Sequence, residues 1–369
     1  MLRRNLPLVV AMATLFGLGI GGMLWLTYYS LPSSHTEPAM LALNELVAPA
    51  GEFPPPGDGP LSWPRDHSAK LDQFAEYWLF AGLLAGNDGR RYGFQLALFR
   101  LALQVEEPVH ESAWATRDIY RAQLLITAAD DVAHISERYS RGVLGLSGAS
   151  NKPLRVWLEN WQVEYDEETM ALHLKAADAA HGLDLRLAPP ADEPQVLGGA
   201  GYRGYWIPGL VAEGELTLAE RRIAVSGRAL LDRLWGRALP IGRGQLALSR
   251  LWLELDDGSA LRCRQLRRRA GGGTPIGECL LRRPDGTSER FEGSRISWEP
   301  VEAGWRNLGG VSYPLRWRLQ LAEYGSELRI TPFADEQAPF AVPLWSGTVE
   351  VNGRSTGWGL LELSNYATP

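Results

Sequence analysis

The sequence predicts an all-β protein that follows one apolar N-terminal segment. Beyond that segment, apolar and polar residues alternate with a period of two over many short stretches, which is the pattern of half-buried strands. Turn-forming residues separate the stretches, and Asn352-Gly353 is a strong signal for a two-residue hairpin loop. Many short strands at close spacing are typical of β-sandwiches and β-barrels.

The first element, residues 1–29, predicts a single transmembrane anchor. Arg3 and Arg4 precede an uncharged apolar run from Leu6 to Leu26, and about 20 apolar residues span a bilayer as a helix. Because positive charges stay in the cytoplasm, we expect a protein of the inner membrane whose body lies in the periplasm or another extracytoplasmic space. A long cleaved signal peptide is the alternative, and it places the body in the same compartment.

The second element is a linker, residues 30–60, which is rich in Pro, Ala and Ser and contains Pro54-Pro55-Pro56-Gly57. Such a composition makes a semi-rigid tether between a membrane and a domain. The strand pattern begins near Leu61. The stretches that predict strands by alternation or by β-rich composition are 93–100, 172–175, 183–187, 222–226, 251–255, 260–266, 316–321, 327–330 and 348–351.

The two cysteines, Cys263 and Cys279, lie at equal distances from Gly271 in a glycine-rich stretch. If the chain turns at these glycines, the cysteines face each other across two strands. An oxidising exterior allows a disulfide there, whereas two buried free thiols are the alternative. Arginines crowd this hairpin, which could face anionic lipid or an acidic partner, or form a solvated sheet face. They are Arg262, Arg264, Arg267, Arg268, Arg269, Arg282, Arg283 and Arg290.

Charge and residue spacing argue against several function classes. The net charge of −6 does not suit a general nucleic-acid binder, which needs a basic surface. The six histidines lack ligand spacing and two cysteines do not complete a closed zinc site, so we expect no metal and no cofactor. The chain also lacks the Gly-x-Ser-x-Gly pattern that carries a hydrolase nucleophile.

Seven short motifs, in order along the chain, carry a resemblance to a known family. They are Trp63-Pro64-Arg65-Asp66-His67, Glu76-Tyr77-Trp78-Leu79-Phe80-Ala81-Gly82, Gly93-Phe94-Gln95, Leu231-Asp232-Arg233-Leu234-Trp235, Tyr313-Pro314-Leu315-Arg316-Trp317, Leu344-Trp345-Ser346-Gly347 and Leu361-Glu362-Leu363-Ser364-Asn365-Tyr366. From Leu61 to Tyr366 the chain resembles the CrtC/AttH-like family. That family includes carotenoid 1,2-hydratases and AttH-type proteins associated with ABC transporters.

The resemblance implies two lipocalin-like antiparallel β-barrels in tandem, over residues 61–237 and 238–369. Barrels of this kind can enclose one small apolar ligand. AttH-type members are usually exported and tethered, and they are often encoded beside permeases of the MacB/FtsX type. The resemblance therefore implies an apolar or lipid-like ligand and an ABC permease as partners. The chain departs from the family pattern at Tyr77, Leu79 and Leu234, where the family usually has Trp, Tyr and Glu.

The resemblance also implies a candidate acid, Asp232, because the aspartate of this motif is thought to protonate a double bond in the hydratases. A buried, protonated carboxylic acid and electron-rich rings around the resulting cation would serve that chemistry. The ring residues that could furnish the pocket and bind a ligand are Trp78, Tyr205, Trp206 and Trp235. If another arginine pairs with Asp232, the carboxyl is ionised and acid catalysis fails.

The remaining charged residues of the motifs favour structural roles. We expect Glu76 to form an ion pair with Arg65 or Arg233 at the closed end of a barrel, and His67 is a weaker candidate for a base. Three functions follow. The first is a membrane-anchored binding protein for an apolar ligand that works with an ABC permease, the second is a hydratase or related lyase acting on an isoprenoid double bond, and the third is an adaptor with filled barrels.

Overall fold

The computed structural model describes residues 51–106, 115–129, 133–151, 154–190, 193–199, 201–219, 221–237, 239, 244–322, 324–325, 327–334, 337, 339–340 and 344–366. All of them belong to one compact unit. The regular elements in these residues are β-strands and three 3₁₀ helices, which confirms the all-β prediction. No helix among the described residues is long and apolar enough to span a bilayer. The expected anchor, residues 1–29, and the linker up to residue 50 lie outside the described residues.

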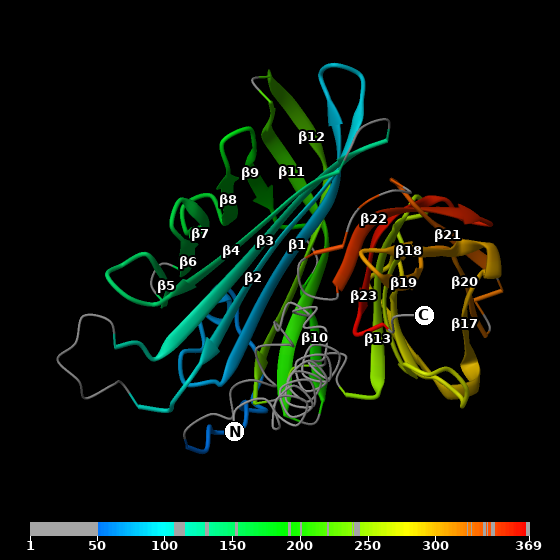
Figure 1. Ribbon diagram of the computed structural model, residues 1–369, viewed down its shortest axis with the longest axis horizontal. Helices are drawn as coiled ribbons and strands as arrows, with labels where there is room; N and C mark the ends of the chain where they lie inside the picture. Colours follow the sequence, from blue (N-terminus) through cyan, green and yellow to red (C-terminus); the bar gives the residue numbers. More distant parts are fainter. Residues whose placement is uncertain are drawn as a thin grey trace, which may run out of the picture. The chain divides into compact units, whose positions relative to one another are not determined.

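The first sheet contains twelve antiparallel strands in the order β4-β3-β2-β1-β12-β11-β9-β8-β7-β6-β5, and β10 pairs with β11. The two ends of this order approach each other, because β3 and β4 contact β5 and β6, so the sheet curls into a nearly closed barrel (Figure 1). The strands are β1 (Ala75–Gly86), β2 (Arg91–Ala102), β3 (Asp118–Ala128), β4 (His134–Arg141), β5 (Ser147–Asn151), β6 (Leu154–Leu158), β7 (Trp161–Asp166), β8 (Ala171–Ala177), β9 (His181–Ala188), β10 (Gln195–Gly199), β11 (Tyr202–Leu218) and β12 (Arg221–Gly236).

The second sheet contains nine strands in the order β16-β15-β14-β13-β23-β22-β21-β20-β17, and a contact between β15 and β17 nearly closes it. The strands are β13 (Leu246–Leu255), β14 (Ala260–Arg268), β15 (Ile276–Arg282), β16 (Ser288–Glu292), β17 (Ile296–Pro300), β20 (Trp317–Leu321), β21 (Glu327–Pro332), β22 (Leu344–Gly353) and β23 (Gly357–Ser364). The short elements are β18 (Trp305–Leu308) and β19 (Val311–Pro314), which pair with each other, and the 3₁₀ helices η1 (Arg65–His67), η2 (Gly293–Arg295) and η3 (Glu302–Gly304).

One turn differs from its expectation. The hairpin of β22 and β23 exists, but its last pair is Val351 with Gly357, so the loop is longer than two residues. Asn352 and Gly353 instead extend β22 and pair with Arg329 and Leu328 of β21. The cross-strand partner on the other side of β22 therefore overrides the local turn signal.

Most of strand β1 and the second half of β12, residues 229–236, are buried on both faces, and the charged residues of the motifs lie in these parts. Along β12, Leu231 and Trp235 belong to the core inside the first barrel. Leu230 and Leu234 belong instead to a second core, which includes Trp252 of the second sheet. Side chains of neighbouring strand residues point to opposite faces. Consecutive residues in this part of β12 therefore face, in turn, the interior of the first barrel and the core shared with the second sheet.

The two cysteines form a disulfide, Cys263–Cys279, between residues that lie directly opposite each other in β14 and β15. The glycines Gly271 and Gly272 in the turn have positive φ angles, which glycine adopts without a steric penalty. At least four of the eight arginines of this hairpin form ion pairs: Arg262 with Asp232, Arg264 and Arg290 with Glu278, and Arg283 with Glu289. These pairs offset part of the positive charge expected on this surface.

Candidate functional site

An aromatic cluster inside the first barrel gathers around His67, and it consists of Trp63, His67, Tyr165, Tyr205 and Trp235. The 3₁₀ helix η1 places the buried His67 ring 5.0 Å from the ring of Trp63 and 5.1 Å from that of Tyr165. Tyr205 of β11 completes the set, because its hydroxyl oxygen lies 2.6 Å from His67 Nδ1. The cluster thus combines segments that are far apart in the sequence.

Burial keeps both members of the His67–Tyr205 pair neutral. It lowers the pKa of His67 to about 4, because the imidazolium loses its hydration, and the nearby Arg233 guanidinium lowers it further. Burial also raises the pKa of the Tyr205 phenol well above its ordinary value. At neutral pH the pair is therefore a hydrogen-bonded imidazole and phenol without net charge.

An ion cluster lies beside the aromatic cluster and is centred on Glu76. Its carboxylate accepts hydrogen bonds from Arg233 Nη2 at 2.6 Å, Arg100 Nε at 2.9 Å and the Lys70 backbone N–H at 2.8 Å. Burial alone would raise the pKa of Glu76, but the two guanidinium groups outweigh it and the pKa is lowered. Arg65 has no part in this pairing, because its side chain is 72% exposed and contacts Asp66 instead.

Three N–H donors of this region are buried and have no hydrogen-bond partner among the described residues: Nε and Nη1 of Arg233 and Nε1 of Trp78. The Arg233 guanidinium lies 4.3 Å from the centre of the Trp78 ring and 5.1 Å from that of Trp235. A buried donor without an acceptor costs about 1–3 kcal/mol. The first barrel therefore presents unsatisfied donors between aromatic faces.

Asp232 faces the other way, toward the second sheet. Its Oδ2 accepts a hydrogen bond from Trp252 Nε1 at 2.6 Å and another from Arg262 Nε, while Arg262 Nη2 lies 3.4 Å from Oδ1. The carboxylate is completely buried and its oxygens are engaged by a guanidinium and an indole. Both oxygens are therefore engaged in the contact with the second sheet and do not face the aromatic cluster.

The expected ligand pocket is therefore split by the alternation of the strands. Trp78, Tyr205 and Trp235 lie inside the first barrel. Trp206 is the register partner of Asp232 across β11 and β12, and it belongs to the core between the sheets. Trp206 and Asp232 thus lie on the opposite side of β11 and β12 from Tyr205 and Trp235, and the four rings are divided between two cores.

Sequence reasoning did not single out Trp63 or Tyr165 as site residues. Trp63 stands in one of the quoted motifs, four residues before His67, so the motif itself contained the signal. Tyr165 ends an alternating stretch with Trp161 and Val163, whose buried side chains line the same barrel. Arg100, the second partner of Glu76, had no sequence signal beyond its place at the end of an expected strand.

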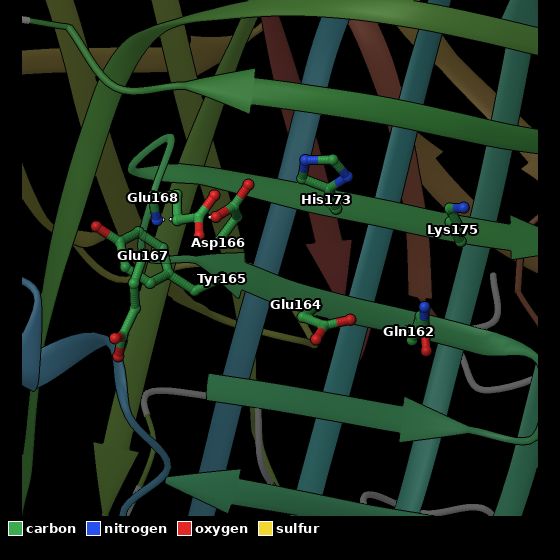
Figure 2. Close-up of a pocket in the computed structure, with 8 residues that line it drawn as sticks. All are labelled: Gln162, Glu164, Tyr165, Asp166, Glu167, Glu168, His173 and Lys175. Atoms are coloured by element: carbon green, nitrogen blue, oxygen red, sulfur yellow. Dashed lines mark hydrogen bonds between the residues drawn. The ribbon is translucent and has the colours of Figure 1, made fainter. Parts of the chain in front are cut away.

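A concavity on the outer face of β7 and β8 differs from the aromatic cluster in character (Figure 2). It is open to solvent and lined by polar and charged residues. Asp166 there accepts hydrogen bonds from the backbone N–H groups of Glu168 and Thr169, so it belongs to a turn. The lining residues are Gln162, Glu164, Tyr165, Asp166, Glu167, Glu168, His173 and Lys175. This lining does not suit an apolar ligand.

Comparisons with known proteins agree with this architecture. Among solved structures, a protein of Nitrosomonas europaea described as a candidate AttH superposes with a TM-score of 0.74 at 23% identity, covering 85% of this chain and 99% of that chain. Kievitone hydratase of Nectria haematococca superposes with a TM-score of 0.62 at 15% identity, covering 87% and 97%. A search of curated proteins found no match. The AttH-like family model matches residues 54–366, and the chain therefore belongs to the AttH-like family.

Proposed function

We propose that the protein is a lipocalin-like binding protein whose first barrel holds an apolar ligand that carries one hydrogen-bond-accepting group. The observation that supports this proposal is the set of unpaired donors on Arg233 and Trp78, buried between aromatic rings. An acceptor on the ligand would satisfy these donors, and the apolar body would contact the rings. Burial of that body supplies about 25 cal/mol per Å² before ordering costs.

The proposal also covers the cellular compartment of the protein and its partner. The segment of residues 1–29 anchors the chain in the inner membrane, the body lies outside the cytoplasm, and the ligand passes to or from an ABC permease of the MacB/FtsX type. Membership of the AttH-like family supports this setting. The Cys263–Cys279 disulfide supports an oxidising compartment, because such bonds are rare in the cytosol.

A hydratase acting on an isoprenoid double bond is the second candidate, and the fold shared with kievitone hydratase favours it. Its proposed acid, Asp232, is engaged by Arg262 and Trp252 and points away from the aromatic cluster. The His67–Tyr205 pair lies beside rings that suit a cation, but the raised pKa of Tyr205 and the neutral imidazole make both poor acids at neutral pH. Binding is therefore the better supported function.

The first experiment is native mass spectrometry of the full chain, purified from membranes in mild detergent, with organic extraction of the bound material. We expect an amphiphile with an apolar body and an acceptor group. An apo protein that also fails to bind any extracted membrane lipid contradicts the binding function and favours an adaptor whose barrels are filled by their own side chains.

Two tryptophan variants test the position of the ligand. Trp78→Phe removes the indole donor inside the first barrel, whereas Trp206→Phe removes an equally buried, unpaired donor that faces the second sheet. We expect Trp78→Phe to weaken retention of the ligand by about tenfold, the value of one buried hydrogen bond, and Trp206→Phe to leave it unchanged. Equal retention by both variants would place the ligand elsewhere.

A further inference from the structure

A cluster of His134, Asp178 and His181 lies outside the aromatic cluster. His134 begins β4, Asp178 follows the end of β8, and His181 begins β9. His134 Nε2 lies 2.6 Å from Asp178 Oδ2, and His181 Nδ1 lies 3.9 Å from Asp178 Oδ1. The two imidazole rings are stacked with their centres 3.7 Å apart. One ligand atom from each residue lies within 4.8 Å of the others.

The turn that carries two of these residues is held by its own hydrogen bonds. Asp178 Oδ1 accepts the backbone N–H groups of Ala180 and His181 at 2.9 Å each, and the Asp178 N–H donates to the His181 carbonyl at 2.8 Å. Because Oδ1 is occupied in this way, Oδ2 is the oxygen that faces His134. The carboxylate is therefore oriented before any ion arrives.

The approach of β4 to this turn does not depend on the cluster itself. Arg138 of β4 donates from Nη2 to the Ala177 carbonyl at 2.8 Å, and its guanidinium lies 4.6 Å from the centre of the Trp161 ring. The side chains of the three cluster residues are 21%, 27% and 30% exposed, so an ion can reach them from solvent.

We propose that His134, Asp178 and His181 bind one divalent transition-metal ion of the zinc class, with water at the fourth position. Imidazole nitrogens and a carboxylate oxygen are ligands that zinc prefers, whereas magnesium and calcium prefer oxygen alone. Ligand atoms about 2.1 Å from a tetrahedral ion lie about 3.4 Å apart. One ligand atom from each of the three residues lies within 4.8 Å of the others, so side-chain rotations alone can bring the three atoms around one ion.

Strand β4 is the first strand of the sheet order, and the connection between β8 and β9 lies in the other half of that order. An ion bound to both would add a contact between the two halves of the sheet where the barrel closes. The expectation of no metal rested on spacing alone. His134 and Asp178 are 44 residues apart, so no local motif could reveal the site.

The test uses the untagged full chain, stripped of metal with a chelator and dialysed against Zn²⁺, with the bound metal measured by elemental analysis. We expect one zinc ion per chain and a higher melting temperature with zinc. His134→Asn, Asp178→Asn and His181→Asn should each weaken zinc binding by about 100-fold and abolish the thermal shift. Co²⁺ should give the visible absorption of a tetrahedral site in the wild type and not in these variants.

The matched control is His173→Asn, which removes a half-exposed histidine of the neighbouring strand that is not in the cluster, and it should bind zinc like the wild type. Asp178→Asn retains an amide oxygen for the turn, so it decides the question if a histidine variant does not fold. The proposal is overturned if the wild type binds no zinc, if the three variants bind it as the control does, or if excess Mg²⁺ displaces it.

Discussion

Asp232 of the first sheet and Arg262 of the second form a buried ion pair between the two barrels. Asp232 is completely buried, and Arg262 is 6% exposed. The indole N–H of Trp252 also donates to this carboxylate, so three residues from two sheets share one contact. Asp232, which the sequence motif suggests as a catalytic acid, thus forms a contact that joins the second barrel to the first.

Asp232→Asn should destabilise the protein without loss of ligand binding. Removing one partner of a buried pair leaves the other charge uncompensated, which costs about 3 kcal/mol or more. Urea denaturation followed by tryptophan fluorescence measures the change. Glu213→Gln breaks an exposed pair with Arg186 and should cost less than about 1 kcal/mol. If the Asp232→Asn variant lost the ligand or an activity while its melting temperature stayed unchanged, Asp232 would have a functional role and not a structural one.

Glu254 should make stability fall as the pH rises toward neutrality. Burial raises its pKa from 4.5 to about 7, although the Gly209 backbone N–H donates to its carboxylate at 2.6 Å. The folded protein therefore binds the proton more tightly, and this stabilisation is complete below about pH 4.5 and lost as the pH rises through about 7. The binding of one proton changes the free energy of unfolding by at most about 1.4 kcal/mol per pH unit.

The measurement for Glu254 is the free energy of unfolding of the wild type and of Glu254→Gln at several pH values. The glutamine cannot ionise, so the variant should gain stability relative to the wild type by about 2–3 kcal/mol between pH 5 and pH 8. Parallel curves of the free energy of unfolding against pH for the two proteins would show that folding does not raise the pKa of Glu254.

His67 should act in the opposite direction. Its pKa is lowered from 6.5 to about 4, so the folded state binds the proton less tightly than the unfolded state. Its contribution to stability is complete above about pH 6.5 and is lost as the pH falls through about 4. The difference in free energy of unfolding between wild type and His67→Gln should shrink over that window. A constant difference would mean that His67 is accessible to protons when folded.

Reduction of the Cys263–Cys279 disulfide should lower the free energy of unfolding by about 3 kcal/mol. The disulfide closes a loop of 16 residues and so restricts the unfolded chain, and this restriction is lost when the bond is reduced. Thermal melts with and without a reductant measure this cost. The double variant Cys263→Ser/Cys279→Ser is the control, since its melting temperature should match that of the reduced wild type and not respond to the reductant. An unchanged melt after verified reduction would contradict the prediction.

Much of the fold follows from local pattern. The alternating stretch 260–266 lies within β14, and the stretch 251–255 lies within β13. The equal spacing of the two cysteines about Gly271 anticipated their opposition in register. Each of these results depends on a residue and its near neighbours, because strand alternation and hairpin symmetry are local properties of the backbone.

The site depended on more than local pattern. In the second half of β12, residues 229–236, both faces are buried, so the sequence shows no polar side that would tell which barrel Asp232 or Arg233 faces. His67 meets Tyr205 across 138 residues, and Asp178 meets His134 across 44. By itself, the sequence determined the all-β class, a part of the strands, the opposition of the two cysteines in a hairpin and the family. Only the tertiary structure decided which charges pair and which rings share a barrel, because those contacts join residues whose separation along the chain carries no information about their distance in space.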